Sequence, residues 1–78
     1  FILKKITLRD VEFNKEYCIV KKSYNLSNLD DQKWYVYGSQ DLFNEDSYVL
    51  EQLDKIRAGS DLNRRDGKTI YRVVTVGQ

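Results

Sequence analysis

The stretch that decides the fold is NEDSYVLEQLDKIRAG, residues 44–59, because its apolar residues follow a helical period. Asn44 is placed to cap the N-terminus of a helix, and Gly59 to end it in a left-handed conformation. Three apolar residues recur at i, i+4 and i+7 and would form one stripe: Val49, Leu53 and Ile56. The sequence therefore predicts one amphipathic helix between Asn44 and Gly59.

Outside this segment, four stretches alternate in the way that strands do, with side chains pointing to opposite faces. Two pairs of turn-forming residues separate them, Asn14–Lys15 and Asp66–Gly67, and the polar residues 25–32 predict a loop. The predicted strands are residues 1–8, 16–24, 33–37 and 68–76. The expected order along the chain is strand, strand, strand, helix, strand.

A chain of 78 residues has room for one hydrophobic core. We therefore expect a single α+β domain over residues 1–78, with a small antiparallel sheet of about four strands and one helix packed on a face. A small open barrel, with the helix plugging one end, would bury the same faces and is the alternative.

The composition excludes several classes of site. The chain has no histidine, and its one cysteine, Cys18, lies in a predicted strand and is interpreted as a buried core residue. A Ser-His-Asp triad, a disulfide and a zinc site of Cys and His are therefore excluded, and the four glycines lie too far apart for a phosphate-binding loop. We expect no enzyme, no cofactor and no metal. A compact ribonuclease working through Lys, Arg, Tyr and Glu is the remaining enzymatic alternative.

The sequence also bears on the compartment and on membranes. No apolar run approaches the ~20 residues that a membrane-spanning helix needs, so we expect no membrane partner. A lone cysteine is typical of a reducing compartment, which favours a cytoplasmic protein.

The charges are segregated along the chain although the net charge is only +1. Residues 1–29 hold six basic and three acidic side chains, residues 30–54 one basic and seven acidic, and residues 55–78 six basic and two acidic. If the terminal strands are neighbours, their basic residues would merge into one patch. The alternative is that each run is a solvated face whose charge the others neutralise.

The first functional hypothesis is a small non-enzymatic binding module or inhibitor that docks on a larger protein or on a protein–nucleic acid complex. Ten aromatic residues are many for so small a core, so some are expected at the surface, beside a polarised distribution of charge. One face of the strand 33–37 must be core, which leaves either its tryptophan or its two tyrosines available. The candidate docking residues are Trp34, Tyr35, Tyr37, Asp41, Glu45 and Asp46. The Asn- and Tyr-rich, proline-free composition looks like that of accessory proteins of phages and mobile elements.

The second hypothesis is a nucleic-acid-binding domain that uses the basic terminal strands. Guanidinium groups in a turn beside an aromatic ring can bind phosphates and stack on bases. The residues of this candidate site are Arg64, Arg65, Lys68, Tyr71 and Arg72. A solubilising hairpin turn is the alternative interpretation of the same residues.

Overall fold

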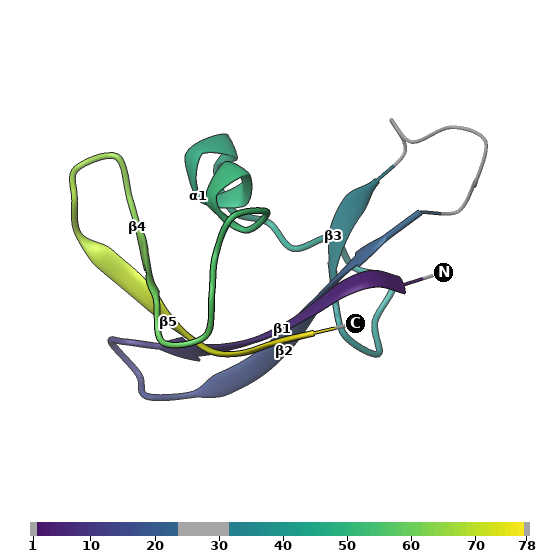
Figure 1. Cartoon of the computed structure of the whole chain (residues 1–78), viewed down its shortest axis with the longest axis horizontal. Coiled ribbons are helices and arrows are strands. Elements are labelled where there is room, and N and C mark those ends of the chain that lie inside the picture. The colour runs from purple at the N-terminus through teal and green to yellow at the C-terminus, as the bar shows by residue number, and fades with distance from the viewer. Residues whose placement is uncertain (1, 24–31, 78) are drawn as a thin grey trace.

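The computed structural model describes residues 2–23 and 32–77 and shows one curved antiparallel sheet with a short helix, α1 (Ser47–Gln52), on its concave side (Figure 1). The sheet has five strands in the spatial order β3-β2-β1-β5-β4. Their bounds are β1 Ile2–Asp10, β2 Glu16–Lys22, β3 Lys33–Val36, β4 Asp61–Asn63 and β5 Thr69–Gly77. The predicted α+β class and antiparallel sheet are confirmed. The sheet is open, so the barrel alternative is wrong.

The first and last strands of the chain are neighbours at the centre of the sheet. β1 pairs with β2 on one side and with β5 on the other, and both pairs are antiparallel. Ile6 lies opposite Val76 and Leu8 opposite Val73, with a bulge in β5 between them. Basic residues from the two ends of the chain therefore belong to one continuous sheet.

The strand β4 is absent from the sequence-based prediction, which had only four strands. Its middle residue, Leu62, is fully buried, and the flanking Asp61 and Asn63 are polar. Three residues are too few to show an alternating pattern, so the prediction treated them as part of a polar connection. The predicted turn at Asp66–Gly67 is confirmed, since it joins β4 to β5 and Gly67 has a φ of 84°.

The helix is shorter than the apolar stripe predicts. Asp46 is its N-cap, with a side chain that accepts a hydrogen bond from Val49 N at 3.0 Å, so the prediction of Asn44 as the cap is wrong. The helix ends at Gln52 with Leu53 as its C-cap, and Lys4 Nζ of the sheet donates to the Leu53 carbonyl at 2.9 Å. Gly59 is left-handed, as predicted, but it lies in a later turn and does not end the helix.

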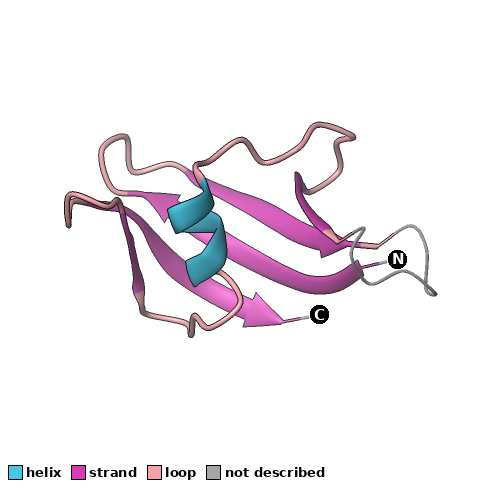
Figure 2. Ribbon diagram, turned by 90° about the horizontal axis from the view of Figure 1, so that it is seen from above, coloured by secondary structure: helices cyan, strands magenta, loops and turns pink. Residues whose placement is uncertain are grey.

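The hydrophobic core lies between α1 and the concave side of the sheet (Figure 2). Three aromatic rings contact one another here, those of Phe43 and Tyr71 in the core and that of Tyr17 packed against it. Their centroids are 5.6 to 6.2 Å apart, and the ring planes are tilted or edge to face. The fully buried apolar residues on this side come from the strands and from the helical segment: Ile6, Leu8, Ile19, Val49, Leu53, Leu62 and Val73. Residues 25–31 of the predicted loop, Tyr24 at the end of the predicted strand 16–24, and Phe1 of the predicted strand 1–8 lie outside the described residues.

Candidate functional site

One face of the sheet is covered by α1, and the opposite, convex face is not (Figures 1 and 2). We call this convex surface the open face. Because side chains alternate along a strand, the registers of β1, β2 and β3 determine which residues reach it. The register places on this side Lys5, Thr7, Arg9, Glu16, Cys18, Val20, Lys22, Lys33, Tyr35, Arg72 and Thr75, with Tyr37 just beyond β3. Two of these side chains are buried and are not accessible from the open face, because Val20 is 0% and Tyr35 is 9% exposed.

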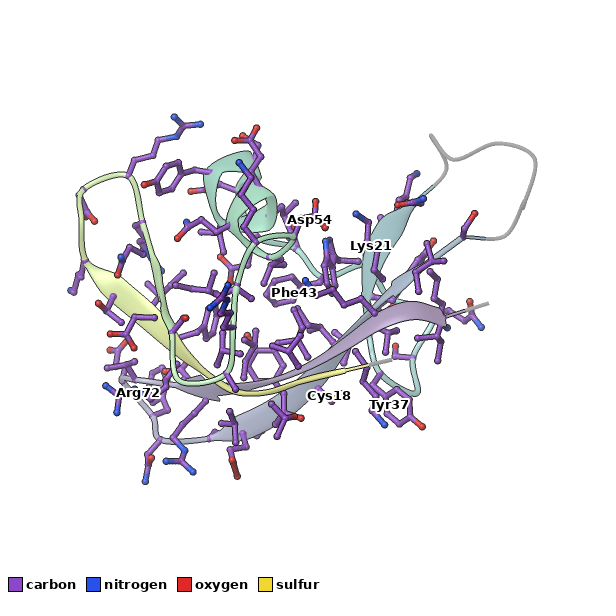
Figure 3. The ribbon with its side chains drawn as sticks, viewed as in Figure 1. Cys18, Lys21, Tyr37, Phe43, Asp54 and Arg72 are labelled. Atoms are coloured by element: carbon purple, nitrogen blue, oxygen red, sulfur yellow. The ribbon has the colours of Figure 1, made fainter. Side chains whose placement is uncertain are left out.

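The end of the open face nearest β3 carries three lysines and two tyrosines. Lys22 lies opposite Lys33 in the β2–β3 ladder, and its Nζ is 5.4 Å from the centroid of the Tyr35 ring. Lys5 Nζ is 4.1 Å from the centroid of the Tyr37 ring. Tyr37 is 50% exposed, and Figure 3 shows it on the side of the sheet away from α1. This end combines ammonium groups with an accessible aromatic ring.

The other end of the open face carries two arginines that lie directly opposite each other. Arg9 of β1 pairs in register with Arg72 of β5, an arrangement of like charges that destabilises a sheet. Each guanidinium has a carboxylate neighbour that offsets this repulsion: Arg9 Nη2 is 3.2 Å from Glu16 Oε1, and Arg72 Nε is 3.2 Å from Asp61 Oδ1. Both ion pairs are exposed to solvent, so each contributes at most about 1 kcal/mol to stability.

Small side chains separate the two ends. Thr7 of β1 lies opposite Cys18 of β2 and opposite Thr75 of β5. Cys18 is partly exposed, so its interpretation as a buried core residue is wrong. The middle of the open face is therefore a shallow strip of hydroxyl and thiol groups between two charged ends.

The charge of the open face is mainly positive. Among the described residues of the five strands, it has two carboxylates, on Glu16 and Asp61, and cationic groups at five positions: Lys5, Arg9, Lys22, Lys33 and Arg72. The sequence predicted that the basic ends would share a patch if the terminal strands were neighbours, and β1 and β5 contribute three of these five cations. The lysines of β2 and β3 were not among the candidate site residues.

The aromatic residues expected to form a docking site are mostly buried. Trp34 is only 7% exposed and belongs to the core under α1, and Tyr35 is 9% exposed. The segment that follows β3 returns along its outer edge, where Phe43 N donates to Trp34 O at 2.8 Å and Leu42 forms a bridge with Tyr35. The expectation that one face of this strand would be available is therefore wrong for Trp34 and Tyr35.

The three acidic candidates do not form one row. Asp41 lies exposed in the turn after β3, Asp46 caps α1, and Glu45 is partly buried. The Tyr71 hydroxyl donates a hydrogen bond to Glu45 Oε1. Two of these carboxylates, on Glu45 and Asp46, thus have structural partners within the chain.

The structure divides the candidate nucleic-acid site between two surfaces. Arg65 lies at the tip of the β4–β5 hairpin, with its Cζ 5.3 Å from the ring centroid of Tyr48 in α1. Arg64 and Lys68 line a depression of about 380 Å³, together with Asp10, Glu12 and the apolar Val11 and Ile70. Arg72 lies instead on the open face (Figure 3). Tyr71 is 9% exposed, which is too little for a base to stack on it.

Tyr17, Tyr71 and Glu45 form a chain of contacts, because the two rings pack edge to face with centroids 5.6 Å apart and the Tyr71 hydroxyl donates to Glu45 Oε1. Burial, followed by the hydrogen bond to Glu45, raises the pKa of Tyr71 to about 12. Burial and its interaction with Tyr71 also raise the pKa of Tyr17. Both phenols stay protonated at neutral pH, so neither is suited to act as a general base. Their contacts link the β-sheet to the segment that leads into α1.

A groove on the side of the sheet that carries α1, opposite the open face, runs between β3, the segment after β3 and α1. Its volume is about 480 Å³, and its lining combines the edge of Trp34 with Phe43, Leu50 and Leu42, the last of which is 51% exposed. Charged residues of both signs also line it: Glu45, Glu51 and Asp54, and Lys21 and Lys33. Asp54 Oδ1 is 2.8 Å from Lys21 Nζ (Figure 3).

Across residues 2–23 and 32–77, no three Cys, Asp or Glu side chains gather as a metal site would require. In the same residues, no helix has both the length and the apolar composition needed to cross a bilayer. Comparisons of the chain with protein-family models, with curated proteins and with solved structures found no match.

Proposed function

We propose that the protein binds nucleic acid through the open face of its sheet. The observation that carries the proposal is that cations from both ends of the chain lie on one uncovered face beside an exposed ring. Lys5 and Arg72, far apart in sequence, belong to neighbouring strands of this face, and Tyr37 adjoins Lys5 at 4.1 Å. Lysine and arginine that neutralise phosphates supply most of the affinity of nucleic-acid binding.

The spacing of the charges suits a backbone with several phosphates. Lys5 and Arg9 are four residues apart on β1, which places their Cα atoms about 13 Å apart at about 3.3 Å per residue. A ligand that spans this distance would contact the lysines at one end and the arginines at the other. Because the ion pairs of Arg9 and Arg72 are exposed and weak, a phosphate can replace a carboxylate as their partner.

The test measures binding of mixed-sequence oligonucleotides by fluorescence anisotropy, with salt varied from about 50 to 200 mM. The double variant Lys22→Ala, Lys33→Ala removes two cations of the open face. The matched control Lys55→Ala, Arg57→Ala removes two exposed cations that lie after α1. We expect the first variant to weaken binding and to make the slope of log affinity against log salt shallower, by about 1.4 for a single strand or about 1.8 for a duplex. The control should change neither the affinity nor the slope.

Two results would contradict the proposal. The first is an absence of binding at low salt by the wild-type protein. The second is an equal loss of affinity in the Lys22, Lys33 variant and in its control, which would indicate an effect of net charge and no particular site.

A second candidate function is docking on a larger protein, as a binding module or inhibitor. The groove beside α1 favours it, because Leu42 is 51% exposed at an apolar lining that also carries Glu51 and Asp54. A partner segment with an apolar anchor and basic neighbours would fit this chemistry. In the test, the immobilised wild-type protein captures a partner, and its variants are compared for capture of that same partner. Leu42→Arg should abolish the capture, whereas Val11→Arg, at a similarly exposed position in the β1–β2 turn, should not. Equal capture by both variants would contradict this role of the groove.

A further inference from the structure

We infer that the ligand of the open face is single-stranded, an inference that rests on the nucleic-acid binding proposed above. Duplex DNA is read by an element that enters a groove, most often a helix. The described helix, α1, has six residues and lies on the opposite side of the sheet (Figure 1). The open face is a surface of paired β-strands. A single-stranded nucleic acid can lie across such a surface, whereas a closed duplex can touch it only through its phosphates.

The middle of the open face leaves room for bases to approach the sheet. Thr7, Cys18 and Thr75 lie side by side across three strands, and directly opposite side chains have Cβ atoms about 5 Å apart. These side chains are short, while the lysines and arginines at the two ends are long. A single-stranded nucleic acid whose phosphates contact the lysine end and the arginine end of the open face would therefore have its bases above a shallow polar strip.

Tyr37 supplies the contact that distinguishes single strands from duplexes. Its ring is half exposed and lies at the edge of the open face, with Lys5 Nζ on the ring at 4.1 Å. A base that stacks on this ring takes the face opposite Lys5 or displaces the ammonium, which is then free to pair with a phosphate of the same strand. Unpaired bases can stack on an aromatic side chain, whereas the bases of a duplex already stack on one another.

The basic tip of the β4–β5 hairpin is the alternative site for a duplex. It carries Arg64, Arg65 and Lys68, but Arg65 lies against Tyr48 of α1, away from the open face. A two-stranded ribbon can enter a major groove. The variant Arg64→Ala, Arg65→Ala therefore reports on duplex binding by the hairpin, separately from the open face.

The experiment compares the affinity for a single strand of about 12 nucleotides with that for its duplex, at equal salt. We expect the single strand to bind more tightly. Tyr37→Leu should weaken binding of the single strand roughly 5- to 150-fold, the loss of one stacked base, whereas Tyr37→Phe keeps the ring and should bind as the wild type does. An abasic strand of the same length should bind the wild type and Tyr37→Leu equally, because it has no base to stack.

Each other outcome has a definite meaning. Duplex binding as tight as single-strand binding, lost in Arg64→Ala, Arg65→Ala, would overturn the inference and the proposed site while leaving nucleic-acid binding in place. Single-strand binding unchanged in Tyr37→Leu would overturn the role of the ring. Binding of neither ligand by the wild type would overturn the proposed function itself.

Discussion

The side-chain amide of Gln52 forms hydrogen bonds to both backbone groups of Asn63. Gln52 Nε2 donates to Asn63 O at 2.8 Å, and Asn63 N donates to Gln52 Oε1 at 3.3 Å. Asn63 belongs to the edge strand β4, so the helix residue occupies groups that another strand could pair with. At the other edge, Phe43 N donates to Trp34 O of β3. With both edges partly occupied by the chain itself, the open face is the larger surface left for a ligand.

The bonds of Gln52 predict a loss of stability on substitution. Gln52→Ala leaves two partly buried backbone groups without this partner and should lower the free energy of unfolding by roughly 1–3 kcal/mol. Gln52→Glu places a carboxylate against Asn63 O and should be worse at neutral pH than at acid pH, where protonation restores a donor. Urea unfolding at both pH values measures the difference. Equal stability of Gln52→Glu at the two pH values would contradict this account of the edge.

The hydroxyl of Tyr71 predicts a second effect on stability. Tyr71→Phe removes the hydrogen bond to Glu45 and leaves a partly buried carboxylate without its phenol, so unfolding should become easier by roughly 1–3 kcal/mol. Tyr48→Phe is the matched control, because it keeps the ring on which Arg65 lies. Thermal unfolding followed by circular dichroism should separate the two variants. A similar midpoint for both would argue against a structural role of the Tyr71 hydroxyl.

The raised pKa values of the tyrosines predict a loss of stability at alkaline pH. In the folded protein the pKa of Tyr71 is about 12, against 10.0 for an unperturbed tyrosine, and that of Tyr17 is also raised. Above pH 10 the unfolded chain therefore loses these protons first. The folded state becomes less stable by at most about 1.4 kcal/mol per pH unit for each tyrosine, and by less where solvent screens the phenolate. Below pH 10 the contribution is complete and constant. Urea unfolding between pH 9 and pH 12 should show the decline, and Tyr71→Phe should make it shallower.

The N-cap of α1 predicts unequal losses of stability for alanine substitutions at Asp46 and at Asn44, two residues before it. Asp46→Ala removes the acceptor of Val49 N and should cost about 1 kcal/mol of stability. Asn44→Ala changes an exposed residue before the helix and should have little effect. Chemical unfolding of the two variants measures this. A larger loss for Asn44→Ala would favour the longer helix that the sequence predicts.

The strands of the sheet could be predicted from sequence where the alternation is long, and β4 could not. β1 and β5 are nine residues long, and each holds an alternating run on one side of a bulge, whereas β4 has one buried residue, Leu62, between two polar ones. The helix was overestimated for a related reason. Ile56 continues the helical period of Val49 and Leu53, and it still packs against the core after the chain has left the helix. Periodicity identifies residues that must be buried, but several backbone paths can bury them.

The candidate site was predicted only in part. Tyr37 and Arg72 reach the open face, and Trp34, Tyr35 and Tyr71 are buried. The lysines of the face could have been found, because Lys5, Thr7 and Arg9 alternate with the apolar residues of β1. Their gathering with Lys22 and Lys33 depends on the spatial order of the strands, which no local pattern contains. The returning segment that helps to bury Tyr35 is a tertiary feature of the same kind.

The carboxylates at the arginine end of the open face predict a gain of function. Glu16 and Asp61 neutralise Arg9 and Arg72, so they compete with a phosphate for the guanidinium groups. The double variant Glu16→Gln, Asp61→Asn should tighten binding of a single strand several-fold at low salt and steepen its salt dependence. It should also lower stability slightly, by about 1 kcal/mol or less per pair, because the two opposed arginines lose their partners.

The control for this gain is Glu51→Gln, which removes one negative charge at an exposed position of α1, away from the open face. A tightening that reflects only net charge would appear with Glu51→Gln in proportion to the charge removed. Anisotropy titrations of the three proteins at several salt concentrations distinguish the cases. If the double variant binds no more tightly than Glu51→Gln, the arginine end takes no part in binding, and the ligand is held by the lysines and Tyr37 alone.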